Sequence, residues 1–230
     1  MAIIRDSFSP YCLAVDPTFD TIHVSIRAPE AGGGGGYYRL ALASGTITAL
    51  AANTIFYAFR NPAANPIIVP NVTVGWRPIA GNTALSFIVS LYVTRSYTVL
   101  DTTGAATAPI LKGEAVTQIR STQMNALARI SNTGALSGGT GTDDAQPLGS
   151  IVFNNPGSIS SVGLTTQAFF PQSGPSSFPG GATGGMGSPY YPLVLAQDEG
   201  FRIRVENTPI GGTNTIVAYV SVDWAEVASF

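Results

Sequence analysis

The side chains that carry most enzyme chemistry are scarce in this sequence of 230 residues, which has one histidine, His23, and one cysteine, Cys12. A catalytic triad would have to be built around His23, but the segment Thr21-Ile22-His23-Val24-Ser25-Ile26 alternates like a β-strand. A histidine on the exposed side of a strand is therefore the favoured interpretation. Cys12 has no basic neighbours or helix start to activate its thiol, which favours a small packed side chain. We expect no catalytic residue and a protein that is not an enzyme.

Glycines and carboxylates suggest two further sites, and neither has the required spacing. The glycine run Gly32 to Gly36 is followed by Tyr37-Tyr38-Arg39-Leu40 and not by the Gly-Lys-Ser/Thr of a phosphate-binding loop, so a flexible hinge is favoured. Asp143 and Asp144 lie in a segment rich in glycine and threonine, where a calcium site is the alternative to a solvated turn. The spacing of a calcium loop is missing, which favours the turn. We expect neither a metal nor a cofactor.

Charged residues make up only 10% of the chain, against about 25% in an average soluble domain. Eleven basic residues face thirteen acidic ones without forming a basic cluster, so nucleic acid is not an expected partner. No stretch reaches the ~18–20 continuous apolar residues of a membrane helix, and the first residues lack the order of a signal peptide. We expect synthesis in the cytoplasm, no membrane partner, and a surface of small neutral side chains that resists association little.

Alternation with a period of two, punctuated by Gly, Pro and Asn, recurs along the chain and is typical of many short strands. It is clearest from Leu85 to Val99, where one parity is apolar and the other polar, which predicts one buried face and one polar face. Further strands are predicted at 38–42, 54–59, 66–76, 192–196, 201–206 and 216–227, the last with a bulge near Ser221. Prolines at 62, 66, 70 and 78 predict short or edge strands. Roughly eight to ten strands favour an all-β fold, an antiparallel jelly-roll-like β-sandwich.

The sequence divides into an extended N-terminal arm with a glycine hinge, residues 1–36, and a jelly-roll-like sandwich domain, residues 37–230. Residues 113–127 are only loosely periodic and are predicted as a short helix or another strand. Three segments are predicted as loops: 30–36, 132–149 and 171–189. The last two exceed the ~4–6 residues of ordinary connections, which indicates a function or contact with a partner.

Apolar residues of the arm are the first candidates for contact with a partner. Ile3, Ile4, Phe8 and Tyr11 belong to a segment too apolar to stay free in water. We expect it to dock on a neighbouring subunit or on a lattice beneath it, with docking on its own domain as an equal alternative. Aromatic residues of the last loop are the second candidates, since exposed aromatics concentrate binding energy, although a lid over the core would use them equally well. They are Phe178, Tyr190 and Tyr191.

Three stretches of the chain have a familiar pattern of residues. They read YYRLALASGTITALAANTIFYAFR at 37–60, VPNVTVGWRPI at 69–79, and PLVLAQDEGFRIRVEN to VAYVSVDWAEV within 192–227. In texture and segment order they resemble virion structural proteins of tailed bacteriophages, of the capsid decoration or cement type. The resemblance implies a jelly-roll subunit, made in the host cytoplasm, that forms homotrimers and binds the major capsid protein on the capsid surface of the virion. It would stabilise the capsid by adding up many modest contacts.

The resemblance brings no functional residue by motif, and a second function fits the same architecture. This alternative is a carbohydrate- or receptor-binding β-sandwich module of a phage tail or fibre. Such a module should gather aromatic and carboxylate side chains in a concave pocket. A decoration protein should instead present a flat, apolar contact related to its copies by symmetry.

Overall fold

The structure is a computed structural model that describes residues 4–5, 12–16, 21–23, 37–48, 50–80, 85–104, 114–115, 128–155, 165–169, 193–206 and 214–226. It divides the chain into two compact units, Met1–Gly34 and Gly35–Phe230. None of the described residues is helical. Accordingly, they contain no helix long and apolar enough to cross a membrane.

The smaller unit, Met1–Gly34, contains a three-stranded antiparallel sheet with the strand order β1-β2-β3. The strands are β1 (Ile4–Arg5), β2 (Cys12–Asp16) and β3 (Thr21–His23). Cys12 pairs with Arg5, and His23 pairs with Ala14. The strand predicted around His23 is thus confirmed for residues 21–23, whereas the exposure of its side chain stays a prediction.

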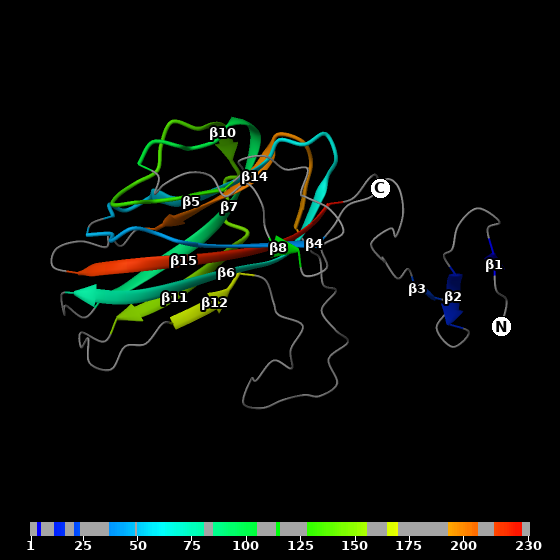
Figure 1. Cartoon of the computed structure of the whole chain (residues 1–230), viewed down its shortest axis with the longest axis horizontal. Coiled ribbons are helices and arrows are strands. Elements are labelled where there is room, and N and C mark those ends of the chain that lie inside the picture. Colours follow the sequence, from blue (N-terminus) through cyan, green and yellow to red (C-terminus); the bar gives the residue numbers. More distant parts are fainter. Residues whose placement is uncertain are drawn as a thin grey trace, which may run out of the picture. The chain divides into compact units, whose positions relative to one another are not determined.

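The larger unit, Gly35–Phe230, contains two six-stranded antiparallel sheets (Figure 1). Sheet I consists of β4 (Tyr37–Ala43), β6 (Ile67–Ala80), β8 (Glu114–Ala115), β12 (Thr165–Ala168), β13 (Leu193–Leu195) and β15 (Thr215–Glu226). Sheet II consists of β5 (Thr54–Asn61), β7 (Leu85–Val99), β9 (Ala128–Ile130), β10 (Thr140–Asp143), β11 (Gly149–Asn155) and β14 (Glu199–Val205). Apolar side chains of both sheets meet in one core, which confirms the predicted all-β sandwich.

The strands follow one another in the order of a jelly roll. The first strand of the unit, β4, pairs with the last, β15, and the second, β5, pairs with the second-last, β14. The next strands pair in the same way, early with late in the chain: β6 pairs with β13 and β12, and β7 pairs with β11 and β10. The short strands β8 and β9 are added beside β4 and β5. A chain folded back on itself and divided between two sheets in this way is a jelly roll, as predicted.

Aromatic side chains from both sheets fill the core. From sheet I, Trp224 lies edge-on to Phe59 of sheet II at 5.8 Å between ring centroids, and Trp76 lies edge-on to Phe87 at 4.9 Å. Phe59 in turn stacks on Phe201 at 5.0 Å. Rings in these arrangements contribute about 0.5–1.5 kcal/mol per pair beyond the burial of their area. The contacts therefore fix how the two sheets pack on each other.

The proline prediction is wrong for β6, which is 14 residues long and central, with β15 on one side and β12 and β13 on the other. Pro70 lies where the register between β6 and β15 shifts between Asp223 and Ala225. Pro78 pairs with Ile216 at the second register shift. Prolines are tolerated in a central strand at such irregularities because the ladder hydrogen bond is already interrupted. The bulge predicted near Ser221 likewise lies two residues further along β15.

Two other predicted segments differ from the structure or lie partly outside its described residues. The segment 132–149, predicted as a loop, contains β10 and the first residue of β11. Its threonines and glycines gave no apolar alternation, since β10 is a polar edge strand. Of residues 113–127, predicted as a short helix or a strand, only Glu114–Ala115 is described, and it is the strand β8. The predicted loops at 30–36 and 171–189 lie outside the described residues.

Strands β12 and β13 are two halves of one edge strand beside β6. Thr165 pairs with Trp76 and Ala168 with Thr73, after which the Phe169 N–H donates to the Val72 carbonyl. Leu193 then resumes the same ladder opposite Val69. Only Pro70 and Asn71 separate the two halves on β6. The residues between them in the sequence are therefore an insertion into a single strand.

Deletion of residues 171–191 should leave the sandwich folded, because Phe170 and Pro192 then fall opposite Asn71 and Pro70 and the strand becomes continuous. We expect cooperative unfolding with a melting temperature within a few degrees of the full chain, measured by circular dichroism. Deletion of residues 170–191 is the matched control. The single remaining residue cannot span the gap at ~3.3–3.6 Å per residue, so burial of Leu195 is lost at a cost of about 2 kcal/mol or more. Equal loss of stability in both variants would contradict the register.

Candidate functional site

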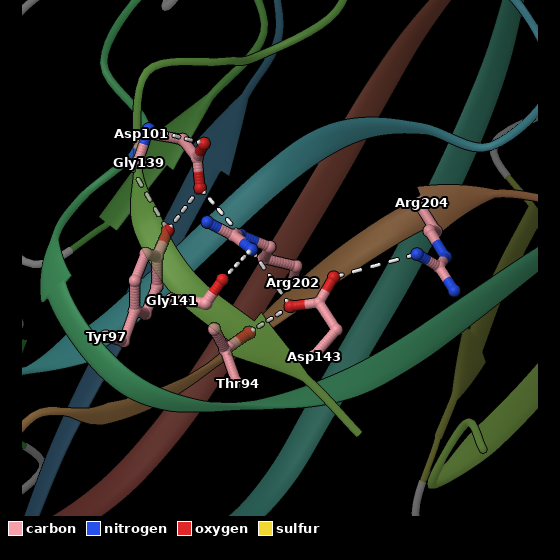
Figure 2. A network of polar contacts seen from close by, with 8 residues as sticks. All are labelled: Thr94, Tyr97, Asp101, Gly139, Gly141, Asp143, Arg202 and Arg204. Carbon is pink, nitrogen blue, oxygen red and sulfur yellow. Dashed lines mark hydrogen bonds and ion pairs between the residues drawn. The ribbon is translucent and has the colours of Figure 1, made fainter. Parts of the chain in front are cut away.

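Arg202 on β14 is the centre of a buried polar network on the outer face of sheet II (Figure 2). The apolar residues of β14 face the core, so the alternating residues Arg202 and Arg204 project from the opposite face. The Arg202 side chain is only 8% exposed. Its Nε atom donates to Asp101 Oδ2 at 2.7 Å, and its Nη1 atom donates to Asp143 Oδ1 at 3.0 Å. A buried guanidinium is thus held between two carboxylates.

Each carboxylate has further donors. The Tyr97 hydroxyl donates to Asp101 Oδ2 at 2.5 Å, and the Gly139 N–H donates to Asp101 Oδ1 at 2.9 Å. The Thr94 hydroxyl donates to Asp143 Oδ1 at 2.8 Å. On its other oxygen Asp143 faces Arg204 Nη1 at 3.6 Å. Each carboxylate thus accepts at least two hydrogen bonds, which offset the cost of burying its charge.

The network is buried because residues 131–139, which precede the edge strand β10, lie over the outer face of sheet II. Leu136 packs with Ala58, Tyr97 and Leu100 in a second apolar cluster, and its N–H donates to the Ile55 carbonyl at 2.7 Å. Gly139 and Gly141 allow the backbone of this segment to approach Asp101 and Thr94 closely. A β-carbon on Gly139 would lie 2.5 Å from Asp101 Oδ2, and one on Gly141 would lie 2.7 Å from the Thr94 methyl group. The glycine-rich sequence before Asp143 is therefore required by the contact.

This cover buries part of the polar face that was predicted for Leu85–Val99. Tyr92 and Thr94 lie on that face and are nevertheless buried. The Arg204 guanidinium lies 3.5 Å from the centre of the Tyr92 ring, and Thr94 lies beneath Asp143. Burial, and then the hydrogen bond to Asp101, raises the pKa of Tyr97 far above its ordinary value. Because the ionic groups of the network bind one another, the arrangement suits an internal clamp better than proton transfer.

Asp143 and Asp144, the adjacent carboxylates of the calcium hypothesis, bind different arginines. Asp143 belongs to the buried network, whereas Asp144 accepts from Arg95 Nε at 3.4 Å on the exposed side. Arg95 also donates to Glu199 Oε1 at 2.5 Å. Both carboxylates are engaged by guanidinium groups, so a calcium ion would have to displace an ion pair at each. The structure favours neither a calcium site nor a simple solvated turn.

The outer face of sheet I is different, because small uncharged side chains line it. We call it the small-residue face and define it by two rows that run across the strands. The first row is Ala43, Tyr219, Gly75 and Thr166, and the second row is Ala41, Ser221, Thr73 and Ala168. An open hollow of about 230 Å³ lies on this face, and Tyr219 is the one large side chain of these rows. The face ends at Asp223, which Arg39 binds at 2.6 and 3.0 Å.

A second uncharged surface lies on sheet II beside the polar network. Val152 pairs with Ile88 across β11 and β7, and Leu148 precedes β11, opposite Tyr92. Val152 and Leu148 are each 50% exposed, and Ile88 is 36% exposed. We call these three residues the apolar strip. Between its members the hydroxyls of Ser90 and Ser150 bond each other at 2.7 Å, so covering the strip would leave few polar groups unpaired.

Most partner-contact residues predicted from the sequence lie outside the described residues. These are Ile3, Phe8, Tyr11, Phe178, Tyr190 and Tyr191. Ile4 lies in β1 and pairs with Leu13. Their part in binding stays a prediction. Phe169, two residues before the last predicted loop, packs against the core.

Neither uncharged surface was predicted from the sequence, although part of the signal is visible there. Alanine, threonine, glycine and serine occupy alternate positions of β4, β6 and β15, and such small outward residues indicate a flat surface. The neighbouring strands had to be known before these positions could be combined. The network around Arg202 was also missed, because Asp101 and Asp143 are distant from it in the sequence.

Substitution of Arg202 by Met should destabilise the fold by about 3–5 kcal/mol, because Asp101 and Asp143 then lose their buried partner. Urea unfolding followed by tryptophan fluorescence measures this change. Arg95→Met is the matched control, since its ion pairs are half exposed and should contribute only about 0–1 kcal/mol. Similar losses in the two variants would show that the Arg202 network does not clamp residues 131–143.

The stability of the fold should decrease as the pH rises above ~10, the ordinary tyrosine pKa. Burial raises the pKa of both Tyr57 and Tyr97, so in that range the unfolded chain releases protons that the folded chain keeps. The stabilisation is fully present below pH ~10 and is lost above it. Melting temperatures measured between pH ~9 and ~11, about one unit either side of that pKa, test this, and Tyr97→Phe should reduce the slope. An unchanged slope in that variant would contradict the assignment to Tyr97.

Potential metal ligands are not clustered in the part of the chain that the structure describes. Across the described ranges, no three or more histidine, cysteine, aspartate or glutamate side chains gather closely enough to hold a metal ion. No protein-family model matches this chain, and no curated protein matches it either.

Proposed function

We propose that this chain is a virion structural protein, not an enzyme, that decorates a capsid and stabilises it by subunit–subunit and subunit–lattice contacts. The observation that carries the proposal is the pair of uncharged surfaces on the two outer faces of the sandwich. The small-residue face lies on the outer side of sheet I, and the apolar strip lies on the outer side of sheet II. The resemblance of the main strands to capsid decoration proteins supports the same function.

Exposed apolar side chains that are neighbours in a sheet are typical of protein interfaces. In the apolar strip, Ile88, Leu148 and Val152 are carried by β7 and β11, which the core holds rigidly on their inner face. A rigid surface loses little conformational entropy on binding. We assign the apolar strip to the contact with the major capsid protein, and the small-residue face to the contact between copies of this chain.

The alternative, a carbohydrate- or receptor-binding module, predicts a pocket where aromatic and carboxylate side chains converge. The hollow on the small-residue face has one aromatic residue, Tyr219, in its lining and no carboxylate. Its volume of about 230 Å³ is also below the ~300–1,000 Å³ of ordinary ligand pockets. These features favour contact with another protein surface over a sugar.

The test is attachment to purified capsid shells of the parent virus, measured by co-sedimentation over a range of protein concentrations. We expect saturable binding by the full chain and a higher melting temperature of the decorated shells. Val152→Arg should weaken attachment at least about tenfold, because the arginine has no partner in an apolar contact. Thr98→Arg is the matched control, since it adds the same charge at another exposed position of β7 and should bind normally.

Circular dichroism and thermal unfolding of both arginine variants show whether they are folded. A folded full chain that ignores the shells but is retained on a glycan array would replace the proposed function by the alternative. Equal binding by Val152→Arg and the full chain would remove the apolar strip from the contact.

A further inference from the structure

We propose that the three-stranded sheet of the smaller unit, Met1–Gly34, is a second point of attachment that lays one apolar face on the major capsid protein. The proposal deepens the proposed function, on which it rests for the identity of the partner. It names the residues that make the contact and the kind of surface that receives them, which is apolar and uncharged.

The pairing of β1, β2 and β3 separates their residues by chemistry. Residues that pair across an antiparallel sheet share a face, and so do residues two apart on one strand. Leu13 of β2 pairs with Ile4 of β1. Its neighbour on the same face, Val15, pairs with Ile22 of β3. This face therefore carries four branched aliphatic residues, and we call it the aliphatic face. The opposite face carries Arg5, Cys12, Ala14, Asp16, Thr21 and His23.

A unit of this size needs another surface to stabilise it. Domains below ~40 residues are usually too small to bury a sufficient core of their own. Cys12 is the only cysteine of the chain, so no disulfide within the chain can compensate. An isolated sheet with so few strands gains its stability mainly from burial of a hydrophobic face. We therefore expect the aliphatic face to be the side that binds.

The aliphatic face is too small to join free copies of this chain. Its strands have 2, 5 and 3 residues, which at ~3.3 Å per residue and ~4.8 Å between strands present about 160 Å² of sheet. Two such faces give about 320 Å², whereas specific interfaces bury ~1,200–2,000 Å². The contact can therefore contribute only where another contact already holds the chain.

The apolar strip supplies that other contact, because it binds the chain to the major capsid protein in the proposed function. A tethered second module binds at an effective concentration of about 1 mM, so a weak contact is enough to be occupied. Residues 24–36 join His23 to Tyr37 and span up to ~46 Å when extended. This length exceeds the ~10 Å between stacked sheets. The unit can thus reach the surface that binds the apolar strip, although Tyr37 belongs to sheet I.

The aliphatic face resembles the apolar strip in chemistry and differs from the small-residue face. Both the aliphatic face and the strip consist of isoleucine, leucine and valine without a charge. Two such surfaces on one chain suit one partner with an apolar surface. The five glycines at 32–36 have the composition of a flexible linker, which a unit that binds a separate protein needs in order to orient itself. A unit fixed on its own sandwich has no such requirement.

Co-sedimentation with purified capsid shells measures the contact in the full chain. Val15→Asp places a charge in the aliphatic face and should weaken attachment at least about tenfold, because the tethered contact is lost while the apolar strip still binds. Ala14→Asp is the matched control, since it adds the same charge one residue away on the opposite face, and it should bind like the full chain. The effect of Val15→Asp should be as large at sparse coverage of the shells as at full coverage.

A fluorescent label on Cys12 reports on the smaller unit itself, because the chain has no other cysteine. Cys12 lies on the face opposite the aliphatic face, so the label leaves the contact free. On saturated shells we expect a higher anisotropy for Ala14→Asp than for Val15→Asp, which only the sandwich holds in place. Without shells the two variants should have equal anisotropy, equal melting temperatures and equal masses in sedimentation velocity.

Equal attachment of Val15→Asp and the full chain would overturn the inference and leave the proposed function intact, as would an equal loss in both variants. Without shells, a difference in anisotropy or melting temperature would assign the aliphatic face to its own sandwich instead, and a difference in mass would assign it to a second copy. An effect confined to full coverage would assign it to a neighbouring subunit. A full chain that ignores the shells overturns the proposed function itself.

Discussion

A buried guanidinium between two carboxylates organises one side of this molecule. Arg202 occupies an outward position on β14, where a charge would ordinarily face water. Here Asp101 and Asp143 bind it, and residues 131–139 cover it. Burying such a group costs several kcal/mol, which close ion pairs and additional hydrogen bonds offset. The glycines at 139 and 141 permit the close approach, and the Tyr97 and Thr94 hydroxyls donate additional hydrogen bonds to the two carboxylates.

Because of this clamp, the chain covers more of the outer face of sheet II than of the outer face of sheet I. On sheet II the chain covers much of its own outer face and leaves the apolar strip beside the cover. On sheet I the small-residue face remains accessible, and Arg39 at one end of it is bound by Asp223. Because the chain has few charges and pairs most of those described above with one another, its accessible surface is mostly neutral. Neutral surfaces on a rigid frame are suited to association by area and shape.

Much of the fold could be predicted from the sequence, because alternation is a local property. The strand predicted at Leu85–Val99 has those bounds in the structure, and the apolar parity of the C-terminal strands faces the core. The prolines of β6 misled the prediction, since the register shifts that accommodate them depend on β15. The candidate site was harder to predict from the sequence than the fold. The partners of Arg202 and the rows of the small-residue face are joined only through strand order, which no local pattern contains.

The division of one edge strand into β12 and β13 has a consequence for the use of this protein as a scaffold. Both ends of the inserted stretch are anchored on the same neighbouring strand, with only Pro70 and Asn71 between their partners. A foreign peptide spliced into this stretch would be tethered at both ends, close together, on a frame that we expect to fold without it. If the protein coats a particle, every copy would display such a peptide in the same orientation, so that the sandwich becomes a carrier for dense, ordered antigen presentation.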